Sequence, residues 1–219
     1  MLKNKSVSDE VYDILKKEII QNQLQPGEHL IVSALSAKFG ISGIPIREAL
    51  VRLTAEKFLI LEHNKGFRVA AKPCNNDLYQ WHEARVLIES YIADAVIAKM
   101  TEAELNELKR LNYGIRSHDR SPGYENHSYL ITMNADFHTI IVNAAGNRLI
   151  NDMYTAVNYD PHLVRFHEGQ GVADLDILCD EHDEIISAIE EKNPARYIEK
   201  TRSHIIHGFK RQIALCKNE

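Results

Sequence analysis

Residues 33–53 read SALSAKFGISGIPIREALVRL, which predicts two short helices joined by a tight turn. Ser33 is positioned to cap the first helix, and Gly40 can end it by adopting a left-handed conformation. Ser42 is positioned to cap the second helix, where Pro45 is tolerated because amides in the first turn have no intrahelical partner. The helical period then predicts one buried stripe along the second helix: Ile46, Ala49, Leu50 and Leu53.

Three residues of the second helix, Ile44, Arg47 and Val51, project from the side opposite this stripe. A helix, a glycine turn and a second helix with outward-facing residues in its N-terminal half form a layout that can enter the major groove of DNA. The pattern alone fits a small structural helical domain equally well.

Two strand-like runs follow, LILE at residues 59–62 and FRVA at residues 67–70. The short connection HNKG at residues 63–66 contains a glycine, so the two runs predict a β-hairpin. Such a hairpin beside a helix-turn-helix is a wing, and His63, Asn64 and Lys65 lie near its tip.

LQPGEHL at residues 24–30, the helix at 35–40 and especially SGIPIREALVRL at 42–53 resemble the winged-helix domain of GntR-family bacterial transcription regulators. The resemblance implies DNA binding, with Arg47 at a guanine edge or a phosphate and Ile44 at a thymine methyl. The family usually carries arginine where this chain has Gly43, which implies an altered base preference. The candidate DNA-binding residues are Ser33, Ser42, Gly43, Ile44, Arg47, Arg52, His63, Asn64 and Lys65.

The 219-residue chain is 44% hydrophobic, which is ordinary for a protein with a buried core. No apolar run approaches membrane-spanning length, and the opening MLKNKSVSDE lacks the apolar region of a secretory signal. Cys74, Cys179 and Cys216 are odd in number and far apart, which favours reduced thiols over a disulfide or a CxxC metal site. We therefore expect a cytoplasmic protein with no membrane partner.

The net charge of −5 is unevenly distributed along the chain. Residues 1–72 carry 11 Lys and Arg against 8 Asp and Glu, a net of +3, whereas residues 73–219 carry 15 against 23, a net of −8. This asymmetry is typical of a basic DNA-reading module joined to an acidic module.

The helical pattern predicts the domain organisation. Ser8 is positioned to cap a first helix that extends to about Gln21, and AKPCNN at 71–76 interrupts the pattern between domains 1–72 and 73–219. Further helices are expected at 76–99, 102–119, 125–145, 147–166, 173–191 and 194–216, with Gly114 able to break the second of these. The fold class is mainly α: a winged helix-turn-helix with a small β-hairpin, followed by an all-helical bundle.

The first helix of the bundle has two charged residues, Arg85 and Glu89, in the middle of an apolar face. A buried guanidinium is costly unless a partner satisfies it, and Glu89 one turn away can form that ion pair. Alternatively, Arg85 can meet an anionic ligand, because its fork matches a carboxylate.

Three histidines and one amide lie on inward faces of three predicted helices. Asn134 and His138 are one helical turn apart, and His182 and His204 lie on or beside apolar stripes. If the side chains converge, their imidazoles suit zinc, nickel or another late divalent metal. The alternative is that each is an ordinary core histidine satisfied by a hydrogen bond.

WHEARVLIES at 81–90, NADFHTIIVNAAGN at 134–147 and the segment at 181–205 resemble the FCD ligand-binding domain of the FadR subfamily. Many such domains hold a divalent metal with three histidines and an aspartate, and the aspartate and first histidine form a D-x-x-x-H motif. The resemblance implies His138, His182 and His204 as ligands, with Asn134 in the place of the aspartate. An amide oxygen can ligate but brings no charge, so weaker binding is expected. Asp136 faces another side of its helix, and His207 does not match the motif.

In FCD proteins that bind metal, the effector resembles a small organic acid that completes the coordination sphere. The resemblance therefore implies that Arg85 recognises a carboxylate and that Glu89 orients Arg85. It also implies a ligand-responsive regulator that dimerises on a pseudo-palindromic operator. Among the two possible outcomes, the resemblance favours repression over activation. The rival functions are a metal-dependent enzyme, for which no Asp or Glu stands beside the histidines as an obvious general base, and a regulator whose helical domain only dimerises.

Overall fold

The computed structural model describes residues 5–72, 74–121, 123–157 and 174–216, and the chain divides into two compact units, Met1–Lys72 and Pro73–Glu219. Within these ranges, no helix combines the length and the apolar character needed to cross a lipid bilayer. Cys74 and Cys179 are free thiols, and the side chain of Cys216 lies outside the described residues.

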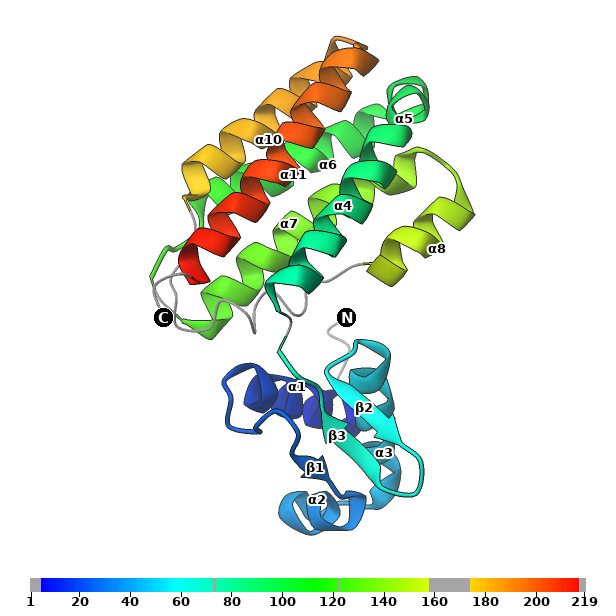
Figure 1. Cartoon of the computed structure of the whole chain (residues 1–219), viewed down its shortest axis with the longest axis vertical. Helices are drawn as coiled ribbons and strands as arrows, with labels where there is room; N and C mark the ends of the chain where they lie inside the picture. Colours follow the sequence, from blue (N-terminus) through cyan, green and yellow to red (C-terminus); the bar gives the residue numbers. More distant parts are fainter. Residues whose placement is uncertain (1–4, 73, 122, 158–173, 217–219) are drawn as a thin grey trace. The chain divides into compact units, whose positions relative to one another are not determined.

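The first unit is a winged helix-turn-helix, as predicted (Figure 1). Its elements are α1 (Val7–Ile20), β1 (His29–Leu30), α2 (Val32–Phe39), α3 (Gly43–Ala55), β2 (Leu59–Glu62) and β3 (Gly66–Val69). The three strands form an antiparallel sheet in the order β1-β3-β2, in which Leu61 and Leu30 both pair with Phe67. Strand β1 was not predicted, because two residues are too few to show an alternating pattern.

The turn and the buried stripe of the helix-turn-helix agree with the sequence. Gly40 ends α2 with a left-handed backbone (φ 67°), and Ser42 occupies the N-cap position of α3, although its side chain makes no capping hydrogen bond. The four stripe residues of α3 are fully buried: Ile46, Ala49, Leu50 and Leu53.

Two predicted N-caps are wrong. The N-cap of α2 is Ile31, which is extended (φ −99°) and makes no side-chain cap, so Ser33 lies inside the helix. The N-cap of α1 is Ser6 and not Ser8, because Ser6 forms a reciprocal capping box with Asp9 three residues later.

The second unit is the predicted helical bundle. It contains α4 (Asn75–Tyr91), α5 (Ala93–Lys99), α6 (Glu102–Ser117), α7 (Tyr124–Ala144), α8 (Arg148–Val157), α10 (Leu175–Glu190) and α11 (Pro194–Cys216). Helix α10 packs between α6 and α11, α4 packs against α11 and α8, and α7 packs against α5, α6 and α8 (Figure 1).

Some boundaries differ from the sequence pattern. The helix expected at 76–99 is divided at Ile92, which ends α4 and begins α5. Gly114 does not break α6; a side chain there would lie 3.5 Å from Tyr129 Oη of α7, so the glycine permits close helix packing. Helix α8 is described to Val157, and the rest of the helix expected at 147–166 lies outside the described residues.

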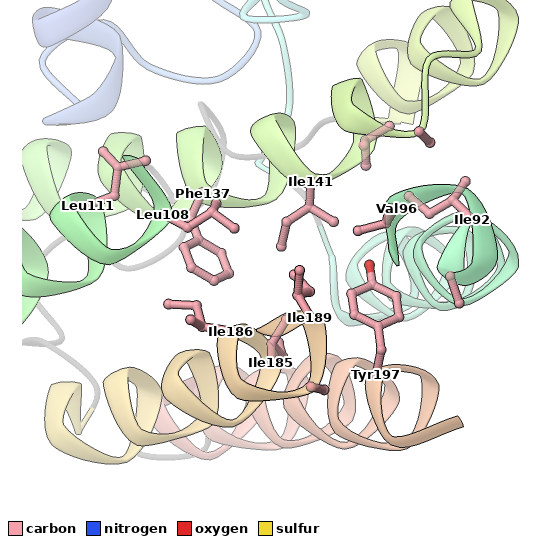
Figure 2. Packing of buried hydrophobic residues seen from close by; sticks show 14 of the residues in the cluster. Ile92, Val96, Leu108, Leu111, Phe137, Ile141, Ile185, Ile186, Ile189 and Tyr197 are labelled. Carbon is pink, nitrogen blue, oxygen red and sulfur yellow. The ribbon is translucent and has the colours of Figure 1, made fainter. Parts of the chain in front are cut away.

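The core between α7 and α10 positions the histidine-bearing helices. Figure 2 shows Phe137 and Ile141 of α7 pointing toward Ile185 and Ile189 of α10, and Tyr197 of α11 beside them. All five side chains are at most 5% exposed. Full burial of such a side chain contributes about 1.5–3 kcal/mol, so this contact fixes the three helices against one another.

Candidate metal centre and DNA-reading face

Three histidines from three helices meet in the bundle interior. His138 of α7, His182 of α10 and His204 of α11 are at most 4% exposed, and their candidate ligand atoms lie within 4.8 Å of one another. The Nε2 atoms of His138 and His204 are 3.1 Å apart. Zinc–nitrogen bonds of about 2.1 Å at tetrahedral angles place ligand nitrogens about 3.4 Å apart, so the spacing of His138 and His204 suits one shared ion.

Each ring is held through its other nitrogen. Nδ1 of His138 lies 2.8 Å from Glu89 Oε2, and Nδ1 of His204 lies 2.9 Å from Glu181 Oε2. Nδ1 of His182 lies 3.1 Å from Oδ1 of Asn112, a residue of α6. Metal-binding histidines are ordinarily oriented by such outer partners, which fix the tautomer and leave Nε2 for the metal.

The outer partners determine where the imidazole protons are. An ionised carboxylate only accepts hydrogen bonds, so His138 and His204 donate from Nδ1 and present Nε2 as a bare acceptor. The Asn112 amide nitrogen donates to Cys179 O and Asp183 Oδ1, so Asn112 Oδ1 accepts from His182. Three lone pairs therefore converge on one place, and acceptors this close repel each other unless a cation lies between them.

Asn134 is the candidate for a fourth donor atom, an oxygen beside the three imidazole nitrogens. It lies one turn before His138 on α7, and its Oδ1 atom is buried without a hydrogen-bond partner among the described residues. Nε2 of His182 is buried and unpartnered in the same way. Such orphaned polar atoms cost about 1–3 kcal/mol each, a cost that a bound cation removes. Three imidazoles and one amide oxygen fit zinc or nickel.

The electrostatic environment keeps the histidines neutral, as metal ligands must be. Burial lowers the pKa of His138 to about 4, against a partial opposing effect of Glu89. Burial and then the neighbouring His204 and His138 hold the pKa of His182 well below its ordinary value. Burial also lowers the pKa of His204, although Glu181 opposes that shift.

Arg85 and Glu89 form the buried ion pair that was one interpretation of the sequence. Arg85 Nε lies 2.7 Å from Glu89 Oε1, and the two side chains are 6% and 0% exposed. Burial alone would raise the pKa of Glu89, but Arg85 and His138 together hold it well below its ordinary value. Tyr154 of α8 reaches the same carboxylate, with its hydroxyl 3.4 Å from Oε1.

The sequence showed no Asp or Glu beside the histidines as an obvious general base. In the structure Glu89 and Glu181 do contact the rings, but each contacts Nδ1 and is paired with an arginine. Glu181 also binds Arg211 at 2.6 Å and His207 at 3.0 Å. His207 is 53% exposed and Asp136 is exposed, so neither belongs to the cluster.

The sequence reasoning missed two outer partners, Asn112 and Glu181. Asn112 interrupts the buried stripe of Leu108, Leu111 and Ile115, which is the same signal that drew attention to Arg85. Glu181 gave a weaker signal, because it adjoins His182 in sequence but contacts His204 on another helix.

The outer face of α3 carries the predicted DNA-reading residues. Ile44 and Val51 are 72% and 54% exposed. They line a mainly apolar hollow together with four other residues: Val32, Gly43, Arg47 and Glu48. A side chain at Gly43 would lie 3.2 Å from Val32 Cγ1, so the glycine brings α3 close to α2.

The basic side chains of the first unit differ in whether an acidic or aromatic side chain already contacts them. Arg52 lies 2.5 Å from Asp9 of α1 and 4.1 Å from the Tyr12 ring centroid, at the end of α3 away from Gly43. By contrast, the side chains of Arg47 and Lys65 make no hydrogen bond or ion pair with any other residue in the described ranges.

The remaining predicted DNA-binding residues are also accessible. Ser33 on α2 and Ser42 before α3 are exposed, as are His63, Asn64 and Lys65 between β2 and β3. Asn64 has a left-handed backbone (φ 60°), as the tight connection requires.

Comparison with known families gives a match for each of the two units. Residues 7–69 match the bacterial regulatory proteins of the gntR family, and residues 80–207 match the FCD domain. The chain is a GntR-family regulator with an FCD domain. Its winged helix-turn-helix is accordingly a DNA-binding module, and the protein is a transcriptional regulator of the FadR subfamily architecture.

Individual relatives of this GntR-family regulator are also regulators and not enzymes. It is 28% identical over 202 residues to the HTH-type transcriptional repressor GlaR of Escherichia coli, covering 89% of this chain and 90% of GlaR. It is 27% identical over 200 residues to the uncharacterized HTH-type transcriptional regulator YdhC of Bacillus subtilis, covering 90% and 85%.

Solved structures share the fold of this GntR-family chain. Escherichia coli McbR/YncC matches with a TM-score of 0.68 at 20% identity, covering 96% of this chain and 99% of that protein. A GntR regulator from Rhodococcus sp. RHA1 matches with a TM-score of 0.69 at 17% identity, covering 96% and 99%.

Proposed function

We propose that the protein is a repressor whose FCD domain holds a divalent metal, zinc or nickel, and senses a small organic acid. The observation that carries the proposal is the convergence of three bare Nε2 acceptors on one buried place, each fixed by a partner at Nδ1. The repressor assignment is supported by relatives described as repressors, GlaR and RspR of Escherichia coli.

His138, His182 and His204 would hold the metal, and the buried oxygen of Asn134 would be the fourth protein ligand. When bound, the metal supplies an anchor for a carboxylate oxygen. The protein side chains keep the site dry and hold the imidazoles neutral at physiological pH.

Arg85 is the proposed second contact of the acid. Its guanidinium is buried. Burial is the largest cause of the lowered pKa of the three histidines, and the positive charge of Arg85 lowers the pKa of each one further. Arg85 therefore lies within electrostatic reach of the metal centre. Glu89 holds Arg85 through Nε, which orients the guanidinium toward a carboxylate.

The FCD domain would also form a homodimer that presents two winged helices to a pseudo-palindromic operator. We propose that Arg47 contacts a guanine edge or a phosphate, that Ile44 contacts a thymine methyl, and that Ser33 and Ser42 contact phosphates. The wing residues His63, Asn64 and Lys65 would reach the minor groove or its phosphates. We assign Arg52 to packing on α1, because Asp9 already pairs with it. A regulator of a bacterial operator would act in the cytoplasm.

Selection of bound duplexes from a random-sequence pool tests this function. We expect one pseudo-palindromic site to be enriched, and we expect organic acids with zinc or nickel to weaken its binding in gel-shift titrations. Failure to prefer any duplex over random competitor at modest salt would refute DNA recognition. Recovery of a site that no acid affects would refute the sensing role.

A second candidate is a regulator whose FCD domain only dimerises, and the neutral amide of Asn134 favours it. Metal analysis of protein purified without an affinity tag separates the two functions. Stoichiometric zinc or nickel supports the sensor, and metal-free protein supports the dimerising module.

A further inference from the structure

The charges in contact with the histidine cluster cancel in pairs. Glu89, which holds His138, is 2.7 Å from Arg85, and Glu181, which holds His204, is 2.6 Å from Arg211. The prospective ligands add no charge, because three imidazoles are neutral and Asn134 carries an amide. A second imidazole, that of His207, also contacts Glu181, but it is exposed and lies outside the cluster.

A divalent cation would therefore bring two positive charges into a site with no net charge to receive them. The ligand side chains are 1%, 0% and 4% exposed, so water cannot disperse that charge. Burying an uncompensated charge is expensive. An aspartate in place of Asn134 would remove half of the imbalance, but this chain does not have one.

We infer that the metal binds together with an acid that carries two negative charges, a dicarboxylate. One carboxylate would bind the metal. The second would neutralise the remaining positive charge of the metal, and the nearby guanidinium of Arg85 would attract it. This inference rests on the proposed metal-dependent sensing and adds the charge class of the acid. Because coupling between two ligands is reciprocal, the metal strengthens binding of the acid by the same factor as the acid strengthens binding of the metal.

Asn134→Asp is the decisive variant, since it replaces the amide nitrogen with an oxygen of similar size and supplies one negative charge at the site. We expect it to bind metal more tightly without any acid and to gain less from a dicarboxylate than wild type gains. The matched control is Asn106→Asp, the same chemical change on the exposed face of α6. It should behave as wild type does.

The experiment titrates untagged full-length protein with Co²⁺, and it follows both heat and the visible absorption of bound Co²⁺. Ionic strength is held constant while the buffer contains no acid, acetate, succinate or sulfate. In wild type we expect succinate to tighten Co²⁺ binding about tenfold or more, within the usual range of coupling between sites. Acetate should have a smaller effect, and sulfate should not replace succinate.

Each contrary result has a distinct meaning. Equal effects of acetate and succinate, or an equal succinate effect in wild type and Asn134→Asp, would overturn the charge argument while leaving the metal centre in place. A sulfate effect as large as that of succinate would overturn the dicarboxylate assignment. Absence of Co²⁺ binding by wild type in every buffer would reject the metal centre and, with it, this inference.

Discussion

His138 and His204 bring their Nε2 atoms within 3.1 Å of each other, although they lie 66 positions apart in the sequence. Both rings direct Nδ1 at a carboxylate, so both present a lone pair to the other. This arrangement is unfavourable unless a cation is shared. Coordination of one metal ion by both rings would remove this repulsion, which is the reason for proposing them as ligands.

The first prediction compares His204→Ala with His207→Ala. Both side chains contact Glu181, but only His204 belongs to the buried cluster. We expect His204→Ala to lose stoichiometric zinc or nickel and His207→Ala to retain it, as measured by elemental analysis of untagged protein. Equal loss in both variants would mean that Glu181, and not the ligand set, governs metal content.

The second prediction concerns the outer partner of His182. Asn112→Ala removes the acceptor that orients the ring, so we expect metal affinity to fall about 10–100-fold, as is usual for outer-sphere changes. Asn106→Ala on the exposed face of the same helix is the control. Calorimetric titration with Zn²⁺ measures both, and an unchanged affinity in Asn112→Ala would contradict the orienting role.

The third prediction is that metal-free protein loses stability as the pH falls from about 6.5 toward 4. The folded-state pKa of His138 is lowered to about 4, so between these values the unfolded chain binds a proton that the folded chain does not. The stabilisation is fully present above pH 6.5, and for His138 it is on the order of 3 kcal/mol. His182 and His204 act in the same direction.

Urea unfolding of chelator-treated protein at pH 7.5 and pH 5 measures this loss. Glu181 stays ionised throughout that window, because its pKa is lowered to about 2: burial would raise it, but Arg211 and His204 outweigh that effect. The variant His138→Gln should show a flatter pH dependence than wild type. The same slope in both proteins would show that His138 is not the group responsible.

The fourth prediction concerns Gly43. We expect Gly43→Arg to tighten operator binding, because it adds a cation at the start of the recognition helix. A side chain there also presses on Val32 Cγ1 at 3.2 Å, so Gly43→Ala is needed to measure the packing effect alone. Gel-shift titration of both variants separates the effects, and no difference in affinity between them would remove the position from the interface.

The fifth prediction uses the salt dependence of DNA binding. The side chain of Arg47 has no hydrogen-bond or ion-pair partner in the described ranges, whereas Arg52 is paired with Asp9. If Arg47 contacts a phosphate, Arg47→Ala should reduce the slope of log affinity against log salt by about one per half-site. Arg52→Ala should leave the slope unchanged, and a loss of slope in Arg52→Ala would reassign that residue to the interface.

Local features were readable in advance because a helix repeats at a fixed period. The spacing of Ile46, Leu50 and Leu53 alone predicted the buried side of α3, and Gly40 marked the end of α2. The residue that caps each helix was harder to predict from the sequence. Ser6 and Ser8 are both serines near acidic residues, and only the capping geometry with Asp9 distinguishes them.

The sequence by itself determined a winged helix-turn-helix, a helical bundle and three inward-facing histidines, since these follow from patterns within single segments. Tertiary structure decided which atoms of those histidines meet and what holds them. Glu89 is 49 positions from His138, and Asn112 is 70 from His182, so no local period relates them. Their contacts exist because the packed helices fix the rings at a set distance and angle, and that geometry leaves Nε2 as the converging atom.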